Sequence, residues 1–190
     1  QDRAWVVWES NDQDGDASGI YLRAFNAKDG AFAPITGEIA VNTTTRGAQC
    51  DPSIAINAAG EICIAWASAA EAGHAVTTAR VFDAQGQPIT DAIAIGAATS
   101  GQDRLASTQA LSDGRFVIAW DHVSASGNPT GIFARTLAAG TESPLSPVQD
   151  LTVDQVHGTH IEPAIAVNSR DELIMTWMHL ADKADGYDIV

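Results

Sequence analysis

The densest group of potential metal ligands in the sequence is an acidic segment near its start, residues 11–16. Asp12, Asp14 and Asp16 place three carboxylates at alternate positions of a loop that also contains glycine. Hard cations such as Ca²⁺ take several oxygen ligands, and a loop of this kind can supply them. It is not an EF-hand, because Arg23 stands where the bidentate glutamate would be. Two interpretations stay open: a calcium site, or a solvated hairpin loop in which Asp and Gly are ordinary turn residues.

Two further carboxylates stand at the start of predicted strands. Asp51 and Glu162 each precede a proline, and Ala106 holds the position that we expect to be equivalent in the unit between them. If these strands surround an axis, the side chains form an acidic ring that binds a cation or sugar hydroxyls, and paired carboxylates are also the groups that glycosidases use. The alternative is that each carboxylate accepts local backbone hydrogen bonds.

Three arginines recur along the chain. Arg23, Arg80 and Arg135 lie 57 and 55 residues apart, each among apolar neighbours. A repeated position of this kind predicts an ion pair to an aspartate at the edge of a sheet, or else a repeated basic ligand pocket. Residues 157–162 contain histidine and glutamate at short spacing but lack the helical frame of a zinc site. Nucleophile-elbow, P-loop and dinucleotide motifs are absent from the sequence.

The two cysteines are predicted to be free thiols. In the hairpin expected around residues 54–66, Cys63 pairs near Ala55. Cys50 then lies about 16 Å from Cys63 along the partner strand, whereas a disulfide needs Cα atoms within about 7 Å of each other. Elsewhere, residues 42–44 match the acceptor sequence for N-glycosylation.

These residues belong to a repeat. Apolar runs end in tryptophans that are 58, 54 and 57 residues apart: Trp8, Trp66, Trp120 and Trp177. After each of the first three comes a second apolar run with one of the arginines, and then a turn glycine: Gly30, Gly86 and Gly140. Because three independent markers share a period of about 56 residues, chance is a poor explanation.

Each unit is predicted to contain four short strands. In the second unit these are residues 52–57, 61–66, 76–82 and 93–96, with tight turns at 58–60 and 83–86. Four antiparallel strands per unit are typical of a β-propeller blade. The alternative, a β-sandwich, gives no reason to return to the same tryptophan and arginine. The units are approximately residues 1–45 (without a first strand), 46–100, 101–154 and 155–190 (ending in the third strand).

The first unit carries a family resemblance. Residues 7–15 (VWESNDQDG), 23–30 (RAFNAKDG) and 38–44 (EIAVNTT) resemble the roughly 50-residue repeats of large secreted or cell-surface bacterial proteins. In those proteins, propeller-like repeats often accompany calcium-binding and adhesin-type modules. The resemblance therefore implies an extracellular or cell-surface bacterial protein, with calcium and adhesion as expected properties.

The charge excludes several classes of partner. Lys and Arg total 10 against 24 Asp and Glu, which gives a formal net charge of -14. Nucleic-acid binding and attraction to an anionic membrane surface both need a basic footprint, and no segment approaches the roughly 20 apolar residues of a membrane-spanning helix. A glycan or a surface protein is the expected partner.

The sequence thus predicts an all-β, partial β-propeller of about 3.4 blades, whereas propellers usually close with about four to eight. We expect a longer chain or another subunit to provide the rest. The leading functional hypothesis is a non-catalytic adhesion or carbohydrate-recognition module, stabilised by calcium. A sialidase-like glycoside hydrolase, which would need axial carboxylates and arginines, and a purely structural spacer are the alternatives.

Overall fold

The computed structural model describes residues 3–28, 32–69, 73–96, 100–141, 143–152, 158–181 and 187–189. The elements in these ranges are fifteen β-strands. The described residues contain no helix that is long and apolar enough to span a membrane.

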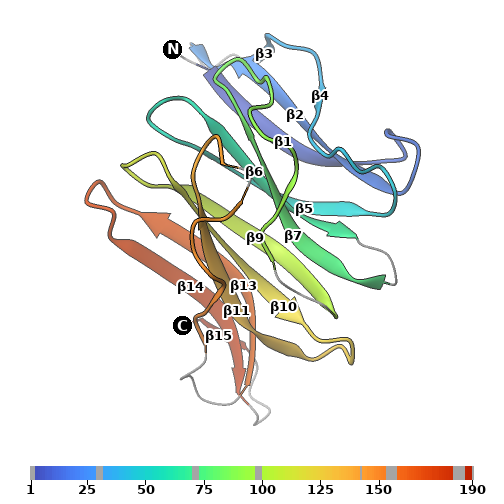
Figure 1. The fold of residues 1–190 in the computed structure, drawn as a ribbon, viewed down its shortest axis with the longest axis vertical. Helices are drawn as coiled ribbons and strands as arrows, with labels where there is room; N and C mark the ends of the chain where they lie inside the picture. Colours follow the sequence, from blue (N-terminus) through green and yellow to red (C-terminus); the bar gives the residue numbers. More distant parts are fainter. Residues whose placement is uncertain are drawn as a thin grey trace.

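The strands form four successive antiparallel groups, which we call the first to fourth blades (Figure 1). The first contains β1 (Arg3–Asn11), β2 (Ser18–Asn26), β3 (Ala33–Pro34) and β4 (Ile39–Ala40). The second contains β5 (Gln49–Ile56), β6 (Ile62–Ala69), β7 (Ala75–Phe82) and β8 (Ile93–Ala94). The third contains β9 (Gln102–Ala110), β10 (Phe116–Val123), β11 (Pro129–Leu137) and β12 (Gln149–Asp150), and the fourth β13 (Gly158–Val167), β14 (Leu173–Ala181) and β15 (Tyr187–Ile189).

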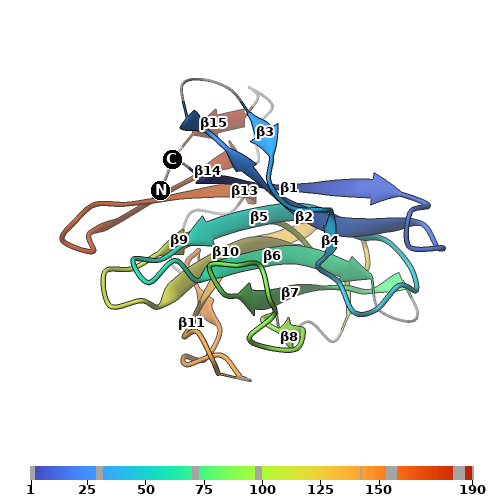
Figure 2. The same ribbon diagram turned by 90° about the horizontal axis from the view of Figure 1, so that it is seen from above.

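In the second, third and fourth blades each strand pairs with the next strand along the chain, whereas in the first blade β3 and β4 both pair with β2. Figure 2 shows β5, β6, β7 and β8 side by side in this order. A parallel bridge between Ala75 and Gln102 joins the second blade to the third. The described blades form an open arc (Figure 1), and the fold is the predicted all-β, partial β-propeller.

The inner strands begin earlier than the sequence suggests. β5 starts at Gln49, β9 at Gln102 and β13 at Gly158, whereas the repeat predicts first strands that begin at residues 52, 107 and 163. The extra residues pair on the far side of an irregularity in each strand, and this irregularity shapes the site described below.

Buried tryptophans pack one blade against another. Trp66 of the second blade lies in one apolar cluster with Ile20 and Leu22 of the first. Trp120 of the third blade lies in another with Val81 and Ile95 of the second. Trp66 and Trp120 therefore pack between neighbouring blades.

Candidate functional site

Each inner strand has a β-bulge opposite the tryptophan of its blade. Pairing of β5 with β6 passes from Cys50↔Ala67 to Ser53↔Ala65, which leaves residues 51 and 52 opposite Trp66. The same shift leaves residues 105 and 106 opposite Trp120, and residues 162 and 163 opposite Trp177. A bulge bends the strand and turns side chains away from the ladder. All three bulges lie at the same position of the repeat.

The bulges correct one predicted correspondence. By strand register, the counterpart of Asp51 and Glu162 is Leu105, and Ala106 corresponds to the prolines that follow the two carboxylates. The sequence prediction was therefore wrong by one residue in the third blade. The cause is that a bulge adds a residue without any mark in the sequence.

The backbone at both carboxylates is in the left-handed region. The φ angle is 54° at Asp51 and 57° at Glu162. Residues with side chains seldom adopt such angles, and each costs on the order of 1–3 kcal/mol. Backbone strain of this kind gathers at ligand sites, where the surrounding structure maintains it.

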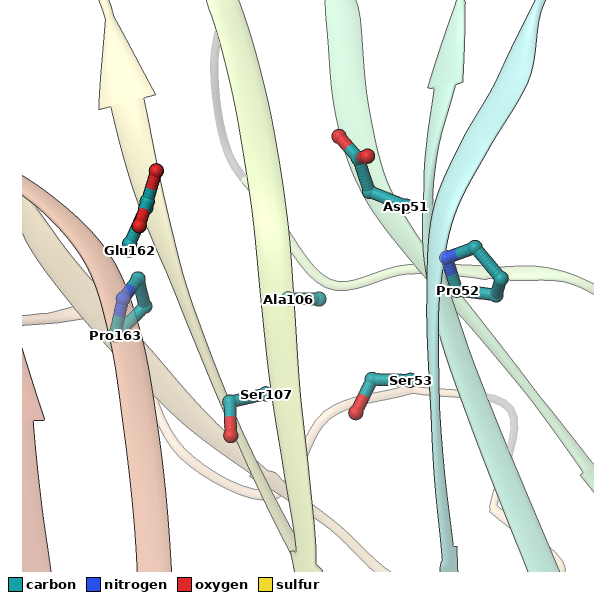
Figure 3. Close-up of a pocket in the computed structure, with 7 residues that line it drawn as sticks. All are labelled: Asp51, Pro52, Ser53, Ala106, Ser107, Glu162 and Pro163. Carbon is teal, nitrogen blue, oxygen red and sulfur yellow. The ribbon is translucent and has the colours of Figure 1, made fainter. Parts of the chain in front are cut away.

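A pocket of about 360 Å³ lies where the three bulges meet. We call it the axial pocket, and it is lined by Asp51, Pro52, Ser53, Ala106, Ser107, Glu162 and Pro163. In Figure 3 the carboxylates of Asp51 and Glu162 lie on either side of β9 and point toward the same end of the pocket. The volume is within the range of about 300–1,000 Å³ that is usual for small-molecule sites.

Two serines fix the spacing of the strands around the axial pocket. Ser53 Oγ accepts a hydrogen bond from the Thr108 N–H at 2.9 Å, and Ser107 Oγ accepts one from the Ile165 N–H at 3.1 Å. These bonds link β5 to β9 and β9 to β13, so the wall of the pocket is held across three blades. Sequence analysis overlooked both serines, although their separation of 54 residues matches the repeat.

The charge of the axial pocket is acidic. Among the described residues, its ionisable lining groups are the two carboxylates, and none of those that line it is lysine, arginine or histidine. Carboxylates accept hydrogen bonds, and an anionic ligand would be repelled there. The pocket can therefore receive a neutral polyhydroxyl compound or a cation.

The recurring arginines lie outside the axial pocket and bind backbone carbonyls. Arg80 Nε donates to the Thr90 oxygen at 3.0 Å, and its Nη1 donates to Val41 of the preceding blade at 2.9 Å. Arg135 makes the same pair of bonds, to Ser146 and Ile95, and Arg23 Nε binds the Thr36 oxygen. Among the described residues these arginines hydrogen-bond to carbonyls, and Asp91 acts on Arg80 through its charge, so the predicted ion pair with an aspartate stays a prediction. Burial lowers the pKa of Arg80.

The acidic loop of residues 11–16 contacts the segment that connects β4 to β5. Asp14 Oδ2 accepts a hydrogen bond from Asn42 at 2.9 Å, and Asp16 Oδ2 accepts one from the Gly47 N–H at 3.0 Å. Asp12 has a φ of 60° at the turn. Within the described residues, no three His, Cys, Asp or Glu side chains gather as metal ligands. Calcium binding by the loop stays a prediction.

The amide of the predicted glycosylation site is already engaged. Asn42 is buried, and its Nδ2 donates to Asp14 and to the Thr44 carbonyl, both at 2.9 Å. The expected acceptor atom is therefore inaccessible in the folded protein. Of the histidines in residues 157–162, His157 lies outside the described residues.

Both cysteines are free, as predicted, and Ala55 pairs with Cys63 in the expected register. Cys50 lies directly before Asp51. Burial, together with the charges of Asp51 and Glu9, raises the pKa of Cys50 from 9.0 to about 11.

Cys50 should therefore react slowly with thiol reagents. At pH 8 its thiolate fraction is about a hundredfold below that of a thiol with the ordinary pKa, because each pKa unit changes that fraction about tenfold. Alkylation by iodoacetamide, followed by mass spectrometry, measures the rate. Asp51→Asn should accelerate the reaction, because it removes a negative charge that disfavours the thiolate. An unchanged alkylation rate in Asp51→Asn would contradict the contribution of the Asp51 charge to the raised pKa of Cys50.

Comparison with known proteins finds similar structures but no similar sequence. No protein-family model and no curated protein matches the sequence. A Dyadobacter fermentans protein of unknown function matches with a TM-score of 0.69 and 16% identity, over 98% of this chain and 48% of the other. The chain thus spans about half the length of that relative.

Two neighbours have named activities. An endo-arabinase from Bacteroides thetaiotaomicron matches with a TM-score of 0.62 and 14% identity, over the whole of this chain and 70% of the other. A Penicillium chrysogenum α-L-arabinanase, solved with arabinobiose, matches with a TM-score of 0.58 and 13% identity, over 98% of this chain and 55% of the other. At these identities the likeness shows the fold alone: this chain has the β-propeller architecture of those glycoside hydrolases.

Proposed function

We propose that this chain is a carbohydrate-binding β-propeller module that holds a neutral glycan in the axial pocket. The observation that carries the proposal is the position of Asp51 and Glu162, which come from two different blades and face one space (Figure 3). Ionised carboxylates form strong hydrogen bonds with donors such as sugar hydroxyls. The arabinobiose complex of a protein with the same fold supports this class of ligand.

A neutral glycan suits the electrostatics better than an acidic one. The part of the pocket wall that the structure describes has two carboxylates and no cationic side chain, and the chain carries a net charge of -14. A sialidase-like site would need arginines to bind an anionic sugar, and the recurring arginines bind carbonyls away from the pocket. The sialidase-like alternative therefore receives no support from this site.

A glycoside hydrolase acting on neutral glycans is the second candidate. Such enzymes place one carboxylic acid and one carboxylate on opposite sides of the scissile bond, and the axial pocket brings two carboxyl groups together. We place either activity outside a bacterial cell, in an adhesion role if the module is non-catalytic. That setting depends on the resemblance of the first unit to repeats of secreted proteins.

Calorimetric titration with neutral oligosaccharides, arabinobiose among them, tests the function. The unaltered chain should bind, and Asp51→Asn combined with Glu162→Gln should weaken binding at least tenfold, since each lost charge-assisted hydrogen bond costs about 1.5–3 kcal/mol. Glu172→Gln is the matched control, because Glu172 is exposed in the turn at the other end of β13.

The results separate the candidates. A folded chain that binds no neutral oligosaccharide would contradict the proposal and favour a structural spacer. Release of the chromophore from a chromogenic glycoside, lost in Glu162→Gln and kept in Glu172→Gln, would identify a hydrolase.

A further inference from the structure

We propose that the protein has a second sugar-binding site, a pocket between the first and second blades that takes one neutral sugar ring. The pocket has a volume of about 190 Å³, and we call it the inter-blade pocket. It shares no described lining residue with the axial pocket. Its volume is below the roughly 300–1,000 Å³ of sites for larger ligands, which suits a single ring. The inference goes beyond the function proposed for the axial pocket, because either site can exist without the other.

The inter-blade pocket lies where the second blade has a small residue in place of an aromatic ring. Trp66 of β6 pairs with Thr78 of β7, and both line the pocket. At the same position of the repeat, β2 carries Tyr21 and β11 carries Phe133. Each of these rings stacks on the tryptophan of its own blade, with centroids 6.2 Å apart. Thr78 therefore leaves open a space that an aromatic ring fills in the first and third blades.

A second small residue widens the same space. By strand register, Ser68 of β6 corresponds to His122 of β10, and Ser68 lines the inter-blade pocket. In the third blade the His122 ring contacts Phe133 edge-on, with centroids 6.3 Å apart. Two hydroxyl side chains thus stand in the second blade where the third blade has two packed rings. The space that they leave accommodates a ring from a ligand.

Two side-chain amides hold the walls of the inter-blade pocket in place. On the second blade, Gln49 Oε1 accepts a hydrogen bond from Trp66 Nε1 at 2.9 Å. On the segment between β4 and β5, Asn42 Nδ2 donates to the Thr44 carbonyl at 2.9 Å. Both amide residues are buried. The pocket is therefore preformed, which lowers the entropic cost of binding.

The chemistry of the lining is that of a site for a neutral polyhydroxyl ring. None of the described residues that line the inter-blade pocket is charged. The side-chain hydroxyls of Thr43, Thr44 and Ser68 make no hydrogen bond to another described residue, and a hydroxyl can both donate to and accept from a sugar hydroxyl. The apolar part of the lining comes from Trp66, Ala92 and Ala94. Trp66 is 1% exposed and closes the bottom of the pocket.

NMR titration of the unaltered chain with D-glucose and with L-arabinose tests the site. A single ring makes few contacts, so we expect a dissociation constant of about 1 mM. The backbone amides of Ser68 and Ala94 should shift and saturate as sugar is added, because both residues line the inter-blade pocket. The amides of Ala106 and Ser107, which line the axial pocket, report on that site separately.

Thr78→Phe places a ring in the inter-blade pocket, as the first and third blades do. It should weaken the binding reported by Ser68 and Ala94 about tenfold or more, since the new side chain clashes with the bound sugar. Thr130→Phe is the matched control, because Thr130 is exposed on β11 of the third blade. If Thr78→Phe does not fold, Ala94→Phe carries the test, because Ala94 lines the pocket from its exposed side.

Amides of Ser68 and Ala94 that do not shift at about 100 mM sugar, a hundred times the expected dissociation constant, would overturn the inference. An unchanged affinity in the folded variant that fills the pocket would overturn it as well. The double variant Asp51→Asn, Glu162→Gln should leave the response of Ser68 and Ala94 intact. If these two amides respond while no neutral sugar or oligosaccharide reaches the axial pocket, the inter-blade site is supported and the function proposed for the axial pocket fails.

Discussion

Gly96→Ala is expected to lower the free energy of unfolding by about 3 kcal/mol or more, because it displaces a buried carboxylate from its partners. A Cβ at residue 96 would overlap with Asp103 Oδ2. Asp103 is 1% exposed. Its Oδ2 accepts the Thr77 N–H at 2.9 Å, and its Oδ1 lies 2.7 Å from His122 Nδ1. The methyl group would break these contacts without giving the charge access to water.

Urea denaturation measures the loss, and Gly37→Ala is the matched control. A Cβ at residue 37 meets nothing within 4 Å, and the residue does not need a left-handed backbone. Such a substitution is expected to be neutral, or to stabilise by about 0.4–1 kcal/mol through the unfolded state. Equal effects at both glycines would show that Asp103 is not the cause.

Trp120→Ala is expected to cost about 3–5 kcal/mol of unfolding free energy, the usual range for a buried tryptophan. The side chain is 1% exposed and stacks on Phe133, with ring centroids 6.2 Å apart. It also packs against Val81 and Ile95 of the second blade, so the substitution opens a cavity between two blades.

Trp8 occupies the same repeat position and is only partly buried, so Trp8→Ala should cost clearly less when both are measured by urea denaturation. A similar loss in the two variants would contradict the assignment of the Trp120 effect to inter-blade packing.

The strands could be predicted from the sequence because their markers are side chains. A tryptophan on one strand and an arginine on the next identify this pair of strands in the first three units, and the tryptophan alone identifies the strand in the fourth. Pairing follows from the short turns, as the register between Ala55 and Cys63 shows. Regular elements with repeated side chains are therefore the predictable part of this fold.

The bulges could not be predicted, because they depend on the partner strand. Nothing in residues 104–107 shows that two of them lie opposite Trp120, so Ala106 was aligned where Leu105 belongs. The hydrogen-bond acceptors of Arg80 and Arg135 could not be predicted for a related reason. Every residue has a carbonyl, and a carbonyl acceptor leaves no mark in the sequence. The two carboxylates of the axial pocket could be predicted from the sequence. The residue equivalent to them in the third blade, and the serine hydrogen bonds that hold the strands around the pocket, could not.

The bulges separate the residues at the pocket from those that set the strand register. Residues 51–52, 105–106 and 162–163 are released from cross-strand pairing, while the ladder resumes on both sides. Under the proposed function, substitutions at the bulge residues that line the pocket are expected to alter ligand binding without shifting the register of any strand. A combinatorial library confined to these positions would then select new ligands on an unchanged scaffold.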